Sequence, residues 1–491
     1  MQQKITVNNS TDFSRLLSSY VESSGYTVYK ISQITGLGRT AIHQTMSGKL
    51  VPTREFFERL CSVFMITPQQ KAELTELYLK VKIGEKAYFE QQKIKDIVEQ
   101  LPQYYIKAGN VTIQYDTALS ETEGSVTGIL NVNHAVMQII GKELQCEKPF
   151  ISTTIPFENK MLYDLVLQVI SGTGKNAVFE HYLRMFKSDD NGVDNNIELL
   201  ENMLRMAMNT GMVYRPFCYY VHKDAVDDIL PIYPYCMITS EYVIMITEDF
   251  QSAVISGSKA VKETASGHIR KVRACSKQII EPVDNRRMFD IFAESSKMFS
   301  KSIEFQPCVT KFFTWNIVST RLADIPEKEY ILETLRKSFF TPEQLAEAEA
   351  QVSMNFFTRK GLEYFADTGV TVNLPGQLLK PLSESERLHI LTSLKNDIGK
   401  HFKMLNEDKI KVPEFIQVIS LVNQSCIISC LMEEKKFCGI LSERSLCSAI
   451  DGFIERLDET DYTVTDEKAV EVIDRCIEKL NNIKGREAYE V

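Results

Sequence analysis

Hydrogen-bonding side chains are concentrated in the stretch GLGRTAIHQTMSGKL, residues 36–50. At about 100° per residue, a helix beginning at Arg39 places most of them on one face and Ile42 and Met46 on the other. Arginine can bond guanine bidentately, glutamine can do so with adenine, and threonine or serine can reach base edges or phosphates. These side-chain types suit the major groove of double-stranded DNA. The candidate DNA-binding residues are Arg39, Thr40, His43, Gln44, Ser47 and Lys49.

The segments around this stretch have the caps and spacings of short helices. Thr11 precedes apolar residues at helical spacing, which predicts a first helix ending by Gly25. Thr53 opens a predicted fourth helix, and Thr67 with Gln70 forms a capping-box start for a fifth. The apolar positions of the first and fourth helices are Phe13, Leu16, Leu17, Tyr20, Val21, Phe56, Phe57, Leu60, Cys61 and Phe64.

A short helix and a glycine turn precede the polar stretch. The helix predicted over residues 28–35 has Ile31 and Ile34 pointing inward. Gly36 supplies the permissive backbone that a sharp turn needs before the helix predicted at 39–46. A short helix, a glycine turn and a second helix form the scaffold that lays a recognition helix in the major groove.

The motif ISQITGLGRTAIHQTMSGKLVP, residues 31–52, is the basis of a family resemblance. With it, residues 12 to about 78 resemble the lambda-repressor-like helix-turn-helix domain of Xre-type bacterial regulators. Ser32 stands where that family usually has alanine, and Ile42 is the aliphatic residue that locks the recognition helix to the core. The chain departs from the family at Val28, where many members have a glutamine that clamps a phosphate.

The resemblance assigns roles to the polar face and leaves one alternative open. It implies base reading by Arg39, Thr40 and Gln44, with His43 on the same face, and phosphate contacts by Ser47 and Lys49. Two-fold dimers reading paired half-sites are the usual arrangement, so we expect a homodimer on double-stranded DNA. The same fold can also serve as a protein-docking module, which is the alternative for this segment.

Charge is unevenly distributed along the chain. The net charge is −9, whereas residues 1–65 carry +3 and the remainder −12. The overall sign argues against a protein that coats nucleic acid along its whole length, but it leaves room for one local basic element. A +3 module would bind weakly alone, because each neutralised phosphate contributes a limited, salt-dependent increment.

Length and composition predict a multidomain cytoplasmic protein. At 44% hydrophobic and 25% charged residues, a chain of 491 residues can bury several cores. The N-terminal sequence has no signal pattern, and apolar runs such as residues 242–246 are shorter than the roughly 18 residues of a membrane helix. Eleven irregularly spaced cysteines fit a reducing compartment. We therefore expect no membrane segment.

Beyond residue 101, a series of helix, four strands and helix occurs twice. The predicted strands are 214–221, 233–239, 242–247 and 252–255 in the first series, and 401–405, 415–422, 426–432 and 437–440 in the second. We infer two related antiparallel meanders flanked by helices, with chance similarity as the alternative. Residues 290–375 are predicted to be mainly helical, with Phe340–Phe357 the strongest stretch.

The predicted fold class is multidomain: an all-α helix-turn-helix head followed by a large α+β body with two meander-plus-helix units. The predicted domains are the DNA-binding head at 1–80, a helical connector at 81–101, a first α+β unit and sensor at 102–289, a helical linker region at 290–375 and a second α+β unit at 376–491. The helix predicted over 85–101 is either a dimer strut or a connector.

Aromatic and polar residues of the first α+β unit form a candidate effector site. Tyrosines with an arginine and a histidine can line a polar-aromatic pocket for an unidentified small molecule or peptide. A sheet face packed in a core is the alternative for the same residues. The candidate ligand-binding residues are Tyr214, Arg215, Tyr219, His222, Tyr233 and Tyr235.

No motif in the sequence supports catalysis, a cofactor or a metal. SGTGKNA at 171–177 lacks the first glycine and the Ser or Thr of a phosphate-binding loop. SGSK at 256–259 matches a serine–lysine pattern but lies where Ser and Gly are ordinary helix caps. The four cysteines between 426 and 447 match no usual zinc spacing, which favours buried thiols over a redox or metal sensor. We expect no enzyme.

Together these patterns predict a sequence-specific DNA-binding transcriptional regulator whose body senses a signal or sets the oligomeric state. The alternative is a non-enzymatic interaction or phage-defence-associated scaffold. Such a scaffold would use the helix-turn-helix head for docking or for control of its own operon.

Overall fold

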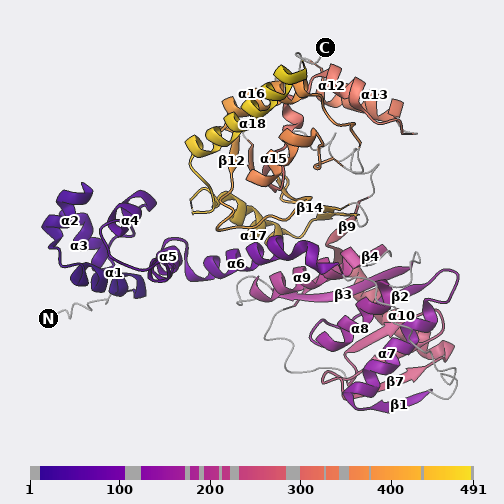
Figure 1. Cartoon of the computed structure of the whole chain (residues 1–491). Helices are drawn as coiled ribbons and strands as arrows, with labels where there is room; N and C mark the ends of the chain where they lie inside the picture. Colours follow the sequence, from indigo (N-terminus) through magenta and orange to yellow (C-terminus); the bar gives the residue numbers. More distant parts are fainter. Residues whose placement is uncertain are drawn as a thin grey trace, which may run out of the picture. The chain divides into compact units, whose positions relative to one another are not determined.

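The computed structural model shows a multidomain α+β protein with two mixed β-sheets (Figure 1). It divides into two compact units, Met1–Lys93 and Ile94–Val491. The structure describes residues 11–105, 123–171, 177–186, 193–209, 213–221, 232–283, 299–325, 328–341, 353–374, 378–432, 436–459 and 461–487.

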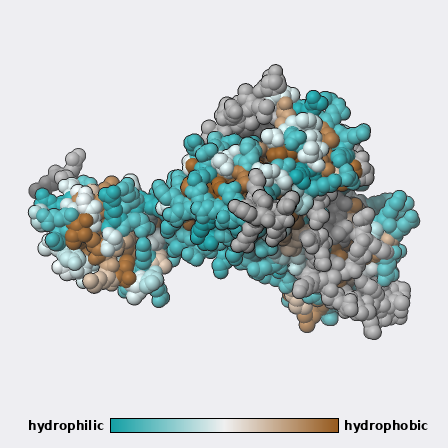
Figure 2. Space-filling view, turned by 45° about the horizontal axis from the view of Figure 1, so that its top comes forward, coloured by the Kyte–Doolittle hydropathy of each residue, from teal (hydrophilic) through white to brown (hydrophobic). Residues whose placement is uncertain are grey.

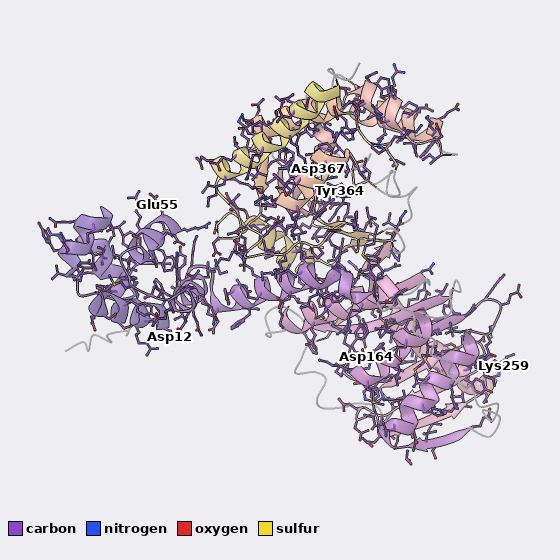
Figure 3. The ribbon with its side chains drawn as sticks, in the orientation of Figure 1. Asp12, Glu55, Asp164, Lys259, Tyr364 and Asp367 are labelled. Carbon is purple, nitrogen blue, oxygen red and sulfur yellow. The ribbon has the colours of Figure 1, made fainter. Side chains whose placement is uncertain are left out.

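The first compact unit begins with five helices. These are α1 (Asp12–Ser23), α2 (Val28–Thr35), α3 (Arg39–Met46), α4 (Arg54–Cys61) and α5 (Pro68–Ile83). Threonine side chains cap four of them, at Thr11, Thr27, Thr53 and Thr67, by accepting a first-turn backbone N–H. Asp12 and Glu55, both labelled in Figure 3, add negative charge to the first turns of α1 and α4, where the helix dipole favours it.

Apolar side chains from all five helices form one core. Stacked and tilted rings of Phe13, Phe57 and Tyr78 lie at its centre, with the Phe57 and Tyr78 centroids 4.4 Å apart. Ile31 is fully buried in this core as predicted, but Ile34 is 49% exposed, so its predicted inward direction is wrong. The buried members are Phe13, Leu17, Val21, Ile31, Ile42, Phe57, Leu60, Cys61, Phe64, Leu74 and Tyr78.

Helix α6 (Glu85–Gln100) crosses the boundary between the two compact units and continues into the 3-10 helix η1 (Leu101–Tyr104). Ile94, Ile97 and Val98 of α6 and Leu101 of η1 are buried in the main core of the second unit. Because the stripe packs inside its own chain, the geometry favours the connector alternative for this helix over the dimer strut.

The first sheet has eight strands in the order β1-β7-β6-β5-β2-β3-β4-β8. Its strands are β1 (Gly124–Thr127), β2 (Phe150–Thr153), β3 (Val178–Phe186), β4 (Val213–Val221), β5 (Tyr235–Ile238), β6 (Val243–Ile246), β7 (Ser252–Ser256) and β8 (Lys277–Gln278). Its helices are α7 (Ile129–Glu143), α8 (Lys160–Ser171), α9 (Val193–Asn209) and α10 (Lys259–Ala274).

The second sheet has seven strands in the order β12-β11-β10-β13-β14-β15-β9. Its strands are β9 (Ile280–Pro282), β10 (Phe299–Glu304), β11 (Met354–Phe357), β12 (Phe402–Met404), β13 (Ile416–Leu421), β14 (Cys426–Leu431) and β15 (Lys436–Leu441). Its helices are η5 (Val309–Phe312), α12 (Trp315–Arg321), α13 (Lys328–Phe339), α15 (Arg359–Thr368), α16 (Glu384–Asp397), α17 (Arg444–Glu455) and α18 (Asp466–Glu487). Figure 3 labels Tyr364 and Asp367 on α15, and Asp367 pairs with Lys479 of α18.

The two sheets share one strand topology. Strands β1 to β7 have the same neighbours, in the same orientations, as β9 to β15, and β8 alone has no counterpart among the described strands. In each sheet three parallel strands, β2-β3-β4 or β10-β11-β12, adjoin a three-stranded antiparallel meander. Helices α10 and α17 follow the meanders, each on the face opposite the helices that connect the parallel strands.

Three predictions about the body are corrected by this topology. The sheets are mixed, not antiparallel, because β4 and β12 lie at a distance from the meanders and pair in parallel with β3 and β11. Residues 290–375 contain the helices η5, α12, α13 and α15, but they also contain strands β10 and β11, so this range is part of the second sheet, which does not begin at 376. Within Phe340–Phe357, residues 354–357 form strand β11, and most of the remainder lies outside the described ranges.

Figure 2 shows a largely hydrophilic face, with apolar residues reaching the surface in small areas, several of them on the head at the left of the view. None of the helices in the described ranges combines the length and apolar character needed to cross a membrane.

Candidate nucleic-acid interface

Helix α3 is held by two buried side chains on its inner face. Ile42 and Thr45 are both fully buried, and the Thr45 hydroxyl donates to the Ala41 carbonyl at 2.9 Å. From α1, the Ser18 hydroxyl donates to the Met46 carbonyl at 3.2 Å. These contacts fix the rotation of α3 about its axis. They therefore determine which of its side chains face solvent.

The opposite face of α3 gathers the predicted polar residues. All six are exposed, and together they line one open hollow on the surface of the head. The residues are Arg39, Thr40, His43, Gln44, Ser47 and Lys49. The Ser47 hydroxyl donates to the Gln44 carbonyl at 3.1 Å.

The turn between α2 and α3 depends on a glycine. Gly36 has φ 72° and ψ 7°, and its N–H donates to the Ser32 carbonyl at 2.9 Å, which ends α2 in the left-handed conformation. The Ser32 hydroxyl donates to the Leu37 carbonyl at 2.6 Å. Serine at this position therefore ties the turn with a bond that alanine cannot make.

A tyrosine that the sequence reasoning did not select orients Arg39. The Arg39 guanidinium lies 5.3 Å from the centroid of the Tyr29 ring, a cation–π distance. Tyr29 is 55% exposed on α2, and its hydroxyl accepts from the Gln33 amide at 2.9 Å. Tyr29 lies at the start of α2 and Arg39 at the start of α3, so no local sequence spacing indicated this contact.

Charge on this part of the head has one sign. Between Glu22 and Glu55 the sequence contains Lys30, Arg39, Lys49 and Arg54 and no acidic residue. In addition, the N-cap of α3 is Gly38, and no side chain of the described residues caps the first turn of this helix. Uncapped backbone N–H groups at a helix start favour an anion such as a phosphate oxygen.

The five candidate effector residues within the described ranges do not converge on one pocket. The buried Tyr214 hydroxyl lies 3.0 Å from His181 Nδ1, whereas Arg215 on the opposite face of β4 lies 3.9 Å from Glu180. Burial raises the pKa of Tyr214 well above its usual range. Tyr219 is half-buried and Tyr233 is exposed. Tyr235 is buried, and its hydroxyl lies 3.0 Å from Arg184. His222 lies outside the described residues.

Buried polar groups in the second sheet were missed entirely. Glu304, Asn355, Asn373 and Gln417 form a hydrogen-bonded cluster there. The strand segment FSKSIE that ends at Glu304 mixes polar and apolar residues and gave no local signal, and the partners lie far away in the sequence.

The cysteines of the second sheet are packed as core residues. Cys426, Cys430, Cys438 and Cys447 are all buried free thiols. Burial raises the pKa of the Cys430 and Cys438 thiols to about 12, so both stay protonated and unreactive. In the described ranges, no three His, Cys, Asp or Glu side chains gather closely enough to hold a metal ion.

Comparisons with known proteins identify no family for this chain. No family model and no curated protein matches the sequence. A solved structure of TrmBL2, an archaeal chromatin protein described as showing a novel mode of DNA binding, is similar at 10% identity. That match covers 55% of this chain and 100% of the other, with a TM-score of 0.21, which is too low to support an argument about fold or function.

Proposed function

We propose that this chain is a sequence-specific DNA-binding transcriptional regulator with an Xre-type, lambda-repressor-like head. The observation that carries the proposal is the single exposed face of α3, where six hydrogen-bonding side chains surround one hollow. Arg39, Thr40 and Gln44 read base edges in the major groove, with His43 beside them. Ser47, Lys49 and the uncapped start of α3 bind the phosphate backbone.

The body gives the head its oligomeric state or its response to a signal. A single weakly basic head binds DNA with limited affinity, and a homodimer presenting two recognition helices to paired half-sites overcomes that limit. The shared topology of the two sheets supports a body built by tandem duplication of one α+β unit. A change in the body then alters the spacing or orientation of two heads.

The test is binding to the promoter next to the protein's own gene, measured by fluorescence anisotropy at several salt concentrations. We expect selective, salt-sensitive binding that falls by at least about tenfold in Arg39→Ala with Gln44→Ala, because each bidentate base contact is worth about 1–3 kcal/mol. Promoter selectivity should fall together with affinity, because both side chains read bases.

A matched control removes the same residue types elsewhere on the head. Arg59→Ala with Gln69→Ala deletes an exposed arginine and an exposed glutamine away from α3. We expect promoter affinity to be unchanged in this control. Equal binding by the native chain and the Arg39 and Gln44 double variant would contradict the site assignment.

A second candidate function, protein docking by the head, is favoured by its exposed apolar side chains. Ile34 on α2 is 49% exposed and Met65 is fully exposed. Exposed apolar residues of this size are common at interaction surfaces when they are contiguous. If promoter DNA and unrelated DNA bind equally weakly, docking replaces DNA reading as the function of this unit.

A further inference from the structure

Between the second sheet and its helical layer lies a partly open cavity of about 260 Å³ that the proposed DNA-binding function does not use. Its walls are mostly apolar and include the aromatic rings of Phe313, Phe340 and Phe402. The apolar lining residues are Phe313, Val318, Leu335, Phe340, Leu378 and Phe402. The volume is just below the roughly 300–1,000 Å³ of drug-sized pockets, so it suits a small molecule.

One wall of the cavity is polar and centres on a buried carboxylate. Glu304, at the end of β10, is 2% exposed. Its Oε1 accepts from the Ser302 hydroxyl at 2.8 Å and from Asn355 Nδ2 at 2.6 Å, and its Oε2 accepts from Asn373 Nδ2 at 2.5 Å. Gln417 donates to the Asn373 carbonyl at 2.7 Å and thereby supports that asparagine.

The arrangement leaves Glu304 able to accept one more hydrogen bond. Each carboxylate oxygen can accept two, and among the described residues Oε1 receives two donors and Oε2 one. The neighbouring cations are engaged elsewhere. Lys311 lies 2.7 Å from Asp397, and Lys301 lies 3.5 Å from Asp451. A buried carboxylate without a cation is costly and favours a positively charged ligand.

We propose that this cavity binds a small monoamine, with the ammonium group donating to Glu304 Oε2 and an apolar body lying among the rings. The carboxylate supplies the charge, and Phe313, Phe340 and Phe402 supply faces on which an alkyl or aryl group packs. Ring faces also attract a cation directly. Such a site would supply the signal that the body senses. Only this effect on DNA binding rests on the proposed function; amine binding itself does not.

The pKa of Glu304 gives the proposed ionic contact a pH signature. Burial raises the pKa of Glu304 to about 7, while its three hydrogen-bond donors oppose that rise. The other titratable groups lining the cavity are Lys301, Cys308, Lys311 and His401. Amine binding requires the ionised carboxylate, so the affinity should rise up to about tenfold between pH 6 and pH 8.

Calorimetric titration of the full-length protein tests the site. The probes are 2-phenylethylamine, hexylamine and cyclohexylmethylamine, each compared with the alcohol that replaces its amine by a hydroxyl. We expect at least one amine to bind one site per chain and its alcohol to bind about tenfold more weakly, because the alcohol replaces a charged hydrogen bond with a weaker neutral one. No binding by any amine, or equal binding by amine and alcohol, would overturn the proposal.

Variants distinguish the cavity from adventitious binding. Glu304→Gln keeps the shape of the side chain and should weaken the amine about tenfold and remove the pH dependence. Leu335 is a half-buried residue of α13 that lines the cavity, and Leu335→Phe should fill the cavity and block amine binding while Glu304 stays intact. This variant keeps the proposal testable if Glu304→Gln fails to fold. The matched control, Glu329→Gln, changes an exposed glutamate on α13 and should bind as the native chain does.

Unchanged amine affinity in both Glu304→Gln and Leu335→Phe would overturn the site. Promoter binding without amine is measured on the same preparations, so the two proposals fail separately. Selective promoter binding with no amine binding removes only the cavity site, whereas amine binding without promoter binding removes only the regulator function.

Discussion

At the scale of single residues, His181 is the buried group with the clearest consequence for stability. It is fully buried between Tyr163 Oη and Tyr214 Oη, each 3.0 Å from a ring nitrogen, and burial lowers its pKa to about 4. A depressed folded-state pKa gives stability that is complete above the ordinary value of about 6.5 and is lost as pH falls toward 4. Between pH 7 and pH 5 this loss amounts to about 2 kcal/mol.

Denaturant unfolding of the native chain at both pH values measures this loss in the unfolding free energy. His181→Gln should remove about that much of the pH dependence, because glutamine does not titrate. His268→Gln, at an exposed histidine of α10, is the matched control and should keep the native pH dependence. A His181→Gln chain that loses stability with acid as steeply as the native chain would show that the imidazole is not the group responsible.

Residues were predictable from the sequence where one short segment contains the whole arrangement. Arg39 to Lys49 lie on a single helix and its cap, so periodicity alone placed them on one face. Glu304, Asn355 and Gln417 come from three strands, and only the pairing of β10 with β11 and β13 brings them together. Sequence spacing contains no information about that pairing, so the cavity was not predicted.

At the scale of elements, the C-terminal half of α6 and η1 are part of the body core, so they should contribute to the stability of the body. Leu101 is fully buried in that core. Its replacement by alanine should lower the unfolding free energy of the body by about 2–5 kcal/mol. The single tryptophan, Trp315 on α12, lies in the second compact unit and reports its unfolding by fluorescence.

Phe89→Ala provides the comparison on the same helix. Phe89 is 43% exposed and lies in the first compact unit, so its loss should leave the tryptophan transition within about 0.5 kcal/mol of the native value. If Leu101→Ala has equally little effect, the apolar stripe of α6 is not a core element and the dimer-strut alternative regains support.

Elements also show where local patterns stop being informative. Strands β4 to β7 and β12 to β15 were predicted near their observed positions, because alternation and turn residues are local properties. The partners of β4 and β12 were wrong, because consecutive strands were assumed to be neighbours. A parallel strand is paired through a crossover connection instead, and strand β11 sits after a segment whose composition favours helix.

At the scale of the whole molecule, the tandem body and the small basic head imply different tasks for different parts of the chain. Residues 1–65 carry +3 and the remainder −12, so a negatively charged body cannot add general affinity for DNA. If the chain has the proposed function, tight binding must come from the number of heads engaged at once. The geometry of the operator, and not the charge of the protein, would then determine the affinity.

The spacing of half-sites provides the test of that reasoning. Two recognition helices of a dimer reach the same side of the duplex only when the half-site centres are about one helical turn, 10–10.5 base pairs, or a multiple apart. Inserting about half a turn between the half-sites should weaken full-length binding to that of a single half-site, and inserting about a full turn should restore much of it. Gel-shift titration with the three operators measures this. A chain that binds all three equally well engages DNA through one head, and the body would then act on affinity by a route other than pairing.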